Sequence, residues 1–272
     1  MPVNASDAAI YVSSGLLPVE AAVDKKTQNF FYSICILTED SSEKQLARRQ
    51  LAVKQIDSSS WFVQIKKILW KYSLPEAEEL LQAPFRQSFW RGKVNWKLHN
   101  YWSSRILDKA ELCRSLRHMN HAYHPGKLHP SLTIPFDSVR SCNRLPIKLK
   151  LLTGTYILQV NIVAFNQNEV DPTCRLCRSS EEKLEHFILI CPMLESIRSA
   201  CFPEIAHEVR QVFGLNFNTL SLVNRVSLVL DCTSYISDNV RQYHRRYNDK
   251  LKYLKGDIVY TEEMVSEPAS DH

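Results

Sequence analysis

The chain has 272 residues, of which 44% are hydrophobic and 23% are charged, and its formal net charge at pH 7 is +5. This composition excludes collagen and an intrinsically disordered chain, because both lack the apolar side chains that build a core. Six residues are glycine, about 2% against a typical usage of roughly 7%. Since glycine supplies the positive φ angles of tight hairpin turns, the sequence predicts a mainly α fold, an irregular multi-helix assembly.

The charges are distributed unevenly. Residues 85–160 carry 13 basic and 3 acidic side chains, a net charge of +10, whereas residues 257–272 carry 5 acidic side chains and no Lys or Arg. A basic block inside a nearly neutral protein is typical of a surface that faces a polyanion. We therefore expect residues 85–160 to contribute to a nucleic-acid-binding surface and residues 257–272 to form an acidic disordered tail.

The apolar runs indicate a protein without a membrane partner. The amino terminus has no basic segment followed by a continuous apolar stretch, and the apolar runs end well before the ~20 residues that a spanning helix requires. We therefore expect an intracellular protein, in the nucleus or the cytoplasm. Eight cysteines are present, and in a reducing compartment clustered cysteines are more often metal ligands than disulfide partners.

Helices are expected throughout the first half of the chain. Apolar spacing, capping residues and prolines place them over 18–37, 43–56, 61–72, 76–83 and 84–113. The first should bury its carboxyl half. In the second, Ser42 is the expected N-cap, and Leu46, Val53 and the Ala and Leu residues between them fall near helical spacing. In the third, three lysines fall between the apolar positions, on a solvated face: Lys66, Lys67 and Lys71.

The second half is more irregular. Residues 118–135 are rich in His and Pro, which predicts an exposed connection. Their four histidines at 118, 121, 124 and 129 lack cysteine or carboxylate support, so a metal site among them is the less favoured interpretation. A basic helix is expected over 138–150, ending at Gly154, then two short helices between 183 and 213 that Pro192 and Pro203 punctuate, and a last helix over 237–256.

Four candidate metal ligands lie within 18 residues, with the spacing C-x2-C-x8-H-x4-C: Cys174, Cys177, His186 and Cys191. Two thiolates separated by two residues can bind one metal ion from a tight turn, and Zn²⁺ prefers four N or S ligands in a tetrahedron. Cys191 follows His186 by five residues, about 140° around an ideal α-helix, so the helix that carries His186 should end before Cys191. Four protein ligands leave no open position, so a bound zinc would be structural. The alternative is a set of ordinary buried thiols with a surface histidine.

The basic block supplies candidate phosphate contacts. These are Arg86, Arg91, Lys93, Lys97, Arg105, Arg140, Arg144, Lys148 and Lys150. Aromatic side chains alternate with them, namely Trp90, Trp96, Tyr101 and Trp102. Such rings can stack on unpaired bases, but for the tryptophans a place in the core is the favoured interpretation.

The segment LLTGTYILQVNIVAFNQNEVDPTCRLCRSSEEKLEHFILICPML (151–194) resembles the region directly after the polymerase in reverse transcriptases of non-long-terminal-repeat retrotransposons, where a similar tract precedes a CCHC zinc-binding motif. SGLLPVEA (14–21), QLARRQLAVKQ (45–55) and SWFVQIKKILWKYSLP (60–75) resemble the helical thumb and connection of those proteins. The resemblance implies a thumb-like segment (1–83), a basic and aromatic helical connection (84–160), a CCHC zinc lobe (161–213) and a carboxyl-terminal helical segment (214–256).

The chain departs from that family at the catalytic motif. It contains no adjacent Asp-Asp pair, whereas polymerisation requires carboxylates that hold two metal ions about 4 Å apart, and the endonuclease portion is also missing. The resemblance therefore implies a non-catalytic nucleic-acid-binding fragment, not an enzyme. Its partners would be RNA or DNA, as element transcript or target DNA, and a separately encoded polymerase domain. The alternative is a decayed or domesticated protein-interaction scaffold, whose Lys and Arg side chains would scatter over the surface.

Overall fold

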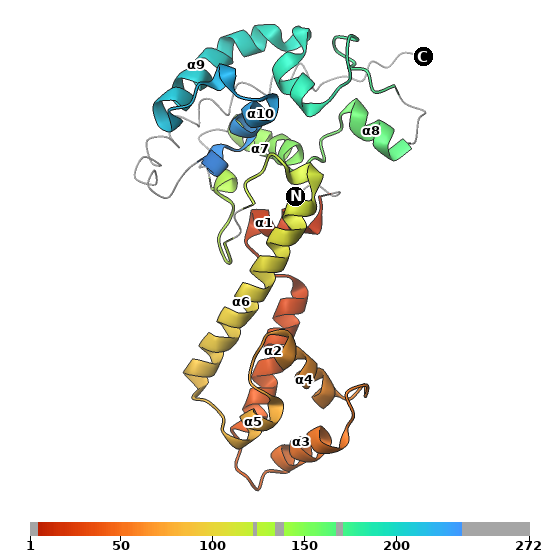
Figure 1. Ribbon diagram of the computed structural model, residues 1–272, viewed down its shortest axis with the longest axis vertical. Helices are drawn as coiled ribbons and strands as arrows, with labels where there is room; N and C mark the ends of the chain where they lie inside the picture. Colours follow the sequence, from red (N-terminus) through yellow and green to blue (C-terminus); the bar gives the residue numbers. More distant parts are fainter. Residues whose placement is uncertain (1–4, 122–123, 134–138, 167–170, 236–272) are drawn as a thin grey trace. The chain divides into compact units, whose positions relative to one another are not determined.

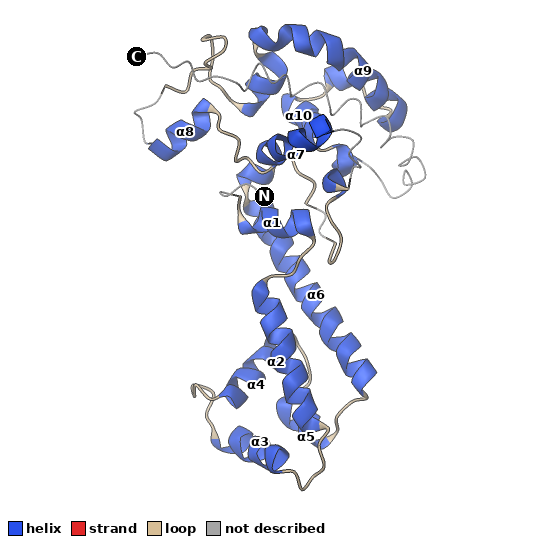
Figure 2. Cartoon of the chain, turned by 180° about the vertical axis from the view of Figure 1, so that it is seen from behind, coloured by secondary structure: helices blue, strands red, loops and turns tan. Residues whose placement is uncertain are grey.

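The structure, a computed structural model, describes residues 5–121, 124–133, 139–166 and 171–235. These residues are mainly helical, with no β-strand among them (Figure 2), which confirms the predicted fold class. The chain divides into two compact units. The α2–α6 unit comprises Ser14–Asp108 and Tyr123–Lys127, and the α7–α10 unit comprises Met1–Ser13, Lys109–Ala122 and Leu128–His272. None of the described helices is both long and apolar enough to span a bilayer.

The α2–α6 unit contains the five helices expected from the first half of the sequence. They are α2 (Val19–Cys35), α3 (Ser42–Val53), α4 (Trp61–Lys71), α5 (Ala77–Gln82) and α6 (Gln87–Leu112), whose last residues belong to the other unit. Helix α2 packs against α3, α4 and α5 (Figure 1). Its carboxyl half is buried as predicted, at Phe31, Tyr32 and Cys35.

Helix α6 buries a stripe of large side chains at four-residue intervals, which is the spacing of neighbours on one side of a helix. The stripe in the α2–α6 unit is Trp90, Val94, Leu98, Trp102 and Ile106. The ring of Trp90 stacks on that of Tyr32, with 5.4 Å between the centroids. The interpretation of the tryptophans as core residues is therefore confirmed for Trp90 and Trp102, whereas Trp96 is 60% exposed.

Helix α3 corrects two predictions. Its N-cap is Ser41, whose hydroxyl accepts from the backbone N–H of Lys44 at 3.3 Å, and Ser42 is the first helical residue. The buried side chains of α3 include Ala47 and Leu51, while Leu46 and Val53 are exposed. The predicted apolar face is thus confirmed at Ala47 and Leu51 and wrong at Leu46 and Val53, because a stripe that runs through residues 47 and 51 turns residues 46 and 53 toward solvent.

Helix α4 corrects the placement of Lys71 on a solvated face. Its ammonium group lies 2.8 Å from the Asp24 carboxylate and 2.5 Å from that of Glu20, and its side chain is only 20% exposed. Tyr72 also donates to Asp24, at 2.7 Å, and the indole of Trp102 donates to the Tyr72 hydroxyl at 2.9 Å. Lys71 is drawn inward because the buried carboxylate of Asp24 requires a cation.

The α7–α10 unit contains α1 (Asp7–Ser14), α7 (Val139–Leu152), α8 (Gln159–Asn166), α9 (Glu195–Phe213), α10 (Leu222–Leu230) and several single helical turns. Helix α7 ends at Gly154 as predicted; Gly154 has a φ of +66°, and the N–H of Thr155 donates to the carbonyl of Lys150. The predicted break at Pro192 is confirmed, because a helical turn over His186–Ile190 ends before it, whereas the predicted break at Pro203 was wrong, because α9 continues through that residue. The predicted helix over 237–256 and the acidic tail lie outside the described residues.

Burial of two histidines corrects the prediction of an exposed His- and Pro-rich connection. His118 and His129 are 3% and 2% exposed. His118 Nδ1 lies 3.0 Å from the Ser227 hydroxyl, and His129 Nε2 lies 3.5 Å from the Asp231 carboxylate. The prediction failed because these imidazoles pair with buried polar groups of α10 and the residue after it, which lie about 100 residues away in the sequence.

Candidate metal centre

The first two candidate ligands lie on a tight turn. The N–H of Cys174 donates to the carbonyl of Ser180, and the N–H of Arg178 donates to the carbonyl of Cys174, both at 2.8 Å. Thr173 and Glu181 form an isolated antiparallel bridge that closes the turn. Arg178 adopts a φ of +54°, a left-handed conformation that is uncommon for a residue with a side chain. The turn therefore brings Cys174 and Cys177 to one side of the segment.

The other two candidate ligands lie on a single wide helical turn. Residues His186–Ile190 form a π-helical turn, and the N–H of Cys191 donates to the carbonyl of His186 at 2.8 Å. An α-helix would place these two residues about 140° apart, whereas a π turn bonds residues i and i+5 directly. The predicted end of the helix before Cys191 is confirmed, and the π geometry brings Cys191 back toward His186.

The four ligand atoms all lie within 4.8 Å of one another. The Sγ atoms of Cys174 and Cys191 are 3.9 Å apart, and Cys177 Sγ is 3.3 Å from His186 Nε2. Cys174 and Cys191 are fully buried, and His186 is 5% exposed. His186 is therefore not a surface histidine, and the cluster could hold a metal ion.

Two serines that the sequence reasoning missed orient these ligands. Ser180 Oγ lies 3.1 Å from His186 Nδ1, so it fixes the ring with Nε2 toward Cys177. The Ser179 hydroxyl donates to Cys177 Sγ at 3.1 Å, and this bond, with a second one from the Ser179 backbone, lowers the pKa of Cys177 to about 6. Burial, by contrast, raises the pKa of Cys191 to about 11. The available signal was a pair of serines two and three residues after Cys177.

The lobe around the four ligands, residues 171–194, buries three aliphatic side chains, Ile188, Leu189 and Leu194, beside its two buried cysteines. Its buried cluster consists of Cys174, Cys191 and Leu194, with Phe187 and Ile197 packed against it. Polar contacts connect it to the rest of the α7–α10 unit. Arg198 of α9 donates to the carbonyl of Cys191, and Arg117 pairs with Glu185 at 2.6 Å.

The basic residues of α6 that are candidate phosphate contacts lie on different sides of the helix. Three cations lie in one row with two aromatic residues, at four-residue intervals; this α6 row consists of Phe89, Lys93, Lys97, Tyr101 and Arg105. Of the three cations, Arg105 is exposed and Lys93 and Lys97 are half-buried. Arg91 is exposed, but it precedes Lys93 by two residues and therefore lies about 200° away around the helix. Arg86 is exposed directly before α6.

The cations of the α6 row lie over aromatic rings. Lys93 Nζ is 4.8 Å from the ring centroid of Phe85 and 5.8 Å from that of Phe89. Lys97 Nζ lies 5.4 Å from the Trp96 ring, and the Arg105 guanidinium lies 5.2 Å from the Tyr101 ring. The row therefore combines positive charge with π surface along several turns of one helix.

The remaining candidates belong to the α7–α10 unit. Arg140 and Arg144 are in α7, and their side chains lie outside the described residues. Lys150 is exposed, whereas Lys148 is 9% exposed and lies below the surface. The structure thus places the nine basic residues in two units, and it groups three of them, Lys93, Lys97 and Arg105, in one row.

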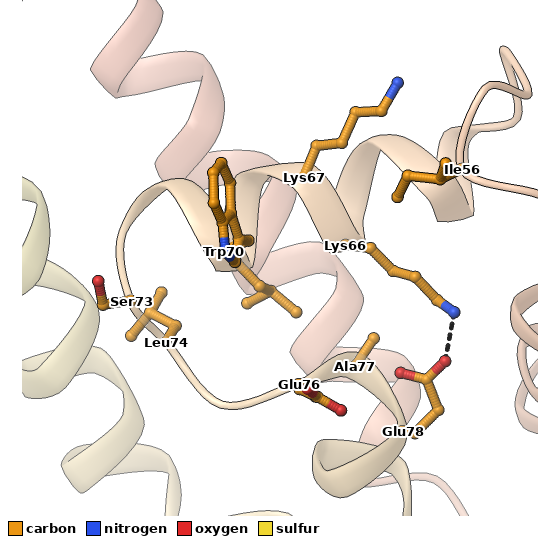
Figure 3. A pocket seen from close by; sticks show the side chains of 10 residues that line it. Ile56, Lys66, Lys67, Trp70, Ser73, Leu74, Glu76, Ala77 and Glu78 are labelled. Carbon is orange, nitrogen blue, oxygen red and sulfur yellow. Dashed lines mark ion pairs between the residues drawn. The ribbon is translucent and has the colours of Figure 1, made fainter.

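A groove of about 780 Å³ lies beside α4 and α5 in the α2–α6 unit. Trp70, which is 84% exposed, and Ile56, which is 65% exposed, line it together with an ion pair between Lys66 and Glu78 (Figure 3). The sequence reasoning did not single out Trp70. Its exposure could have been inferred from its position, because Trp70 follows the buried Leu69 directly in the last turn of α4 and therefore points to another side of the helix.

Comparisons of the chain with protein-family models, with curated proteins and with solved structures find no match. The resemblance of residues 151–194 to reverse transcriptases of non-long-terminal-repeat retrotransposons therefore stays a prediction from the sequence.

Proposed function

We propose that the chain is a non-catalytic nucleic-acid-binding protein in which a zinc-stabilised lobe accompanies a basic and aromatic surface on α6. The observation that carries the proposal is the α6 row. Its cations would neutralise phosphates, and two nearby rings, those of Phe89 and Trp96, are 56% and 60% exposed and have free area on which bases can stack. A face that served only for solubility would not need large aromatic side chains next to its cations.

The geometry of the four ligands supports zinc. With bond lengths of about 2.3 Å to sulfur and 2.0–2.1 Å to nitrogen, a tetrahedral zinc site separates two sulfurs by about 3.8 Å and a sulfur from a nitrogen by about 3.6 Å. The corresponding separations here are 3.9 Å and 3.3 Å. Three thiolates with one imidazole are also a donor set that suits Zn²⁺. When bound, the metal would hold the turn of Cys174 and Cys177 against the π turn of His186 and Cys191.

We infer further that this lobe corresponds to the CCHC motif of non-long-terminal-repeat retrotransposon reverse transcriptases. The four motif residues lie close enough together to share one ion, as that correspondence requires. The nucleic acid would then be the RNA transcript of the element or its DNA target, in the nucleus or the cytoplasm, and a separately encoded polymerase domain would supply the missing carboxylates.

The test is a salt titration of the affinity of the full chain for a fluorescent single-stranded oligonucleotide. Affinity should fall as salt rises, because binding releases counterions. Replacing Lys93, Lys97 and Arg105 with Gln should reduce the slope of log K against log salt by about 2, since each contact with a single strand contributes about 0.7. Arg49→Gln, an exposed charge on α3, is the matched control. Absence of binding at low salt, or an affinity indifferent to salt, would contradict the proposal.

The second candidate function is a protein-interaction scaffold with no nucleic-acid role. The observation that favours it is the groove with the exposed indole of Trp70, since aromatic side chains are enriched at protein interfaces. The same titration separates the two functions, because a scaffold predicts no salt-dependent oligonucleotide binding.

A further inference from the structure

A second pocket lies in the α7–α10 unit, outside the metal cluster. It has a volume of about 380 Å³ and is bordered by α9, by α10 and by the short turn η5 (Phe217–Thr219). Two arginines line it, Arg198 from α9 and Arg225 from α10, together with Glu195 and Asn218. Arginines from two different helices thus line one pocket.

Arg198 is held rigidly and still has an unused donor. It is 4% exposed, and its Nε and Nη2 donate to Glu195 Oε2 at 3.2 and 2.8 Å, while Nη2 also donates to the carbonyl of Cys191. Its Nη1 is buried and has no acceptor among the described residues. A buried N–H of a charged group is costly to leave without an acceptor, so Nη1 requires one that the described protein does not supply.

Arg225 also has a buried donor without an acceptor in the described part of the chain. Its guanidinium group lies 4.9 Å from the ring centroid of Phe217, and its Nε is buried with no acceptor among the described residues. Burial lowers the pKa of Arg225. Both arginines that line the pocket therefore have a buried donor without an acceptor among the described residues.

The charge of the pocket favours an anion. Of its lining residues, the two arginines are positive and one, Glu195, is negative, which leaves a net charge of +1. The Glu195 side chain is 69% exposed, so water screens much of its charge. Guanidinium groups match phosphate oxygens in geometry, and a tetrahedral phosphate has enough oxygens to accept from two arginines that approach from different helices.

We infer that the Arg198–Arg225 pocket binds a phosphate group. The phosphate could be the free inorganic ion or part of a nucleotide, because the pocket, at about 380 Å³, is larger than one phosphate. The inference does not rest on nucleic-acid binding, because no lining residue belongs to the α6 row and none is one of the four metal ligands. The pocket does adjoin the lobe, through Leu189 and through the Cys191 carbonyl that accepts from Arg198, so the experiment uses the metal-loaded chain.

The test is calorimetric titration of the full, metal-loaded chain with inorganic phosphate in a phosphate-free buffer. The wild-type chain should bind one phosphate saturably. Arg225→Gln should weaken binding by at least about tenfold, as loss of a charge-assisted hydrogen bond predicts. Glu195→Gln, which removes an exposed competing charge, should tighten it about threefold. Arg210→Gln, an exposed residue of α9 that does not line the pocket, should have no effect.

No saturable phosphate binding by the wild-type chain, or equal affinity in the wild-type chain and Arg225→Gln, would overturn the inference. If Arg225→Gln does not fold, as judged by circular dichroism, Glu195→Gln decides the question, because unchanged or weaker binding in that variant is equally contradictory. A parallel titration with a nucleoside 5′-monophosphate identifies the source of the phosphate. Tighter binding than that of inorganic phosphate indicates a nucleotide, and equal binding indicates the free ion.

Discussion

The two units of the chain are stabilised in different ways. In the described part of the α2–α6 unit, few polar side chains are buried, among them Asp24, Gln28 and Lys44. The α7–α10 unit buries many more, including His118, His129, Lys148, Glu182, His186, Arg198, Glu208, Ser227 and Asp231. The first unit thus buries mainly apolar helix faces, whereas the second also buries many polar side chains, some of them paired across about 100 residues of sequence, and the candidate metal ligands. The two units should respond differently to metal removal, mutation and pH.

Metal removal should have the largest effect and should act on one unit. A structural zinc contributes about 10–16 kcal/mol to the folding of a small zinc-binding module, and the lobe at residues 171–194 has only a small apolar cluster to replace it. We expect chelation to expose the amides of Cys174 and Cys191 to hydrogen exchange while the amides of α4 stay protected. Equal protection before and after chelation would contradict the difference between the units.

Cys177→Ser should reproduce the effect of chelation, because it removes one of the four ligands. Cys113→Ser is the matched control: Cys113 is another half-buried cysteine of the same unit, and it does not belong to the cluster. A similar loss of protection in both variants would mean that any cysteine replacement disturbs the unit.

In the α2–α6 unit the largest effect should come from an apolar truncation. Trp90 is fully buried and stacked on Tyr32, so Trp90→Ala should lower the free energy of unfolding of this unit by about 3–5 kcal/mol. Trp96→Ala, on the same helix but 60% exposed, should change it by less than about 0.5 kcal/mol. Chemical denaturation followed by circular dichroism measures both, and equal effects would show that α6 does not pack as described.

The pH dependence should be larger in the α7–α10 unit. Burial and the neighbouring Arg117 lower the pKa of His118 from its ordinary 6.5 to about 4, although Glu185 opposes them. Between these values the unfolded chain binds a proton that the folded chain does not. The contribution of His118 to the free energy of unfolding is therefore fully present above pH 6.5, and up to about 3 kcal/mol of it is lost as the pH falls to 4.

Unfolding measured at a series of pH values tests this contribution. His118→Gln should remove it, whereas His121→Gln, whose histidine is only half-buried, should keep the wild-type dependence. A wild-type pH profile in His118→Gln would show that other groups cause the acid sensitivity.

The smallest predicted effect concerns the cap of α3. Ser41→Ala should lower stability by about 1 kcal/mol, because it removes the acceptor for the N–H of Lys44. Ser42→Ala should cost less, since Ser42 is inside the helix. The difference in denaturation midpoint between these adjacent variants measures the cap, and the opposite order would restore Ser42 as the N-cap.

The same contrast explains what could be predicted from the sequence. The helices of the α2–α6 unit were found because their signals are local, as in α4, where the buried Ile65 and Leu69 recur at helical spacing. The buried pairs of His118 with Ser227 and of His129 with Asp231 were missed, because nothing local in the sequence shows a contact over such a separation.

At the candidate metal centre the ligand types and spacing identified all four residues. The π turn that brings Cys191 back to His186 was not predictable from α-helical periodicity. The Arg198–Arg225 pocket was missed for a similar reason, because single arginines on two helices give no motif.

Elemental analysis of the full chain, purified without added metal, tests the central claim most directly. We propose that a structural zinc holds the lobe together, which predicts one zinc per wild-type chain, unchanged in Cys113→Ser and lost in Cys177→Ser. A wild-type chain that contains no zinc and keeps the amides of Cys174 and Cys191 protected would contradict it.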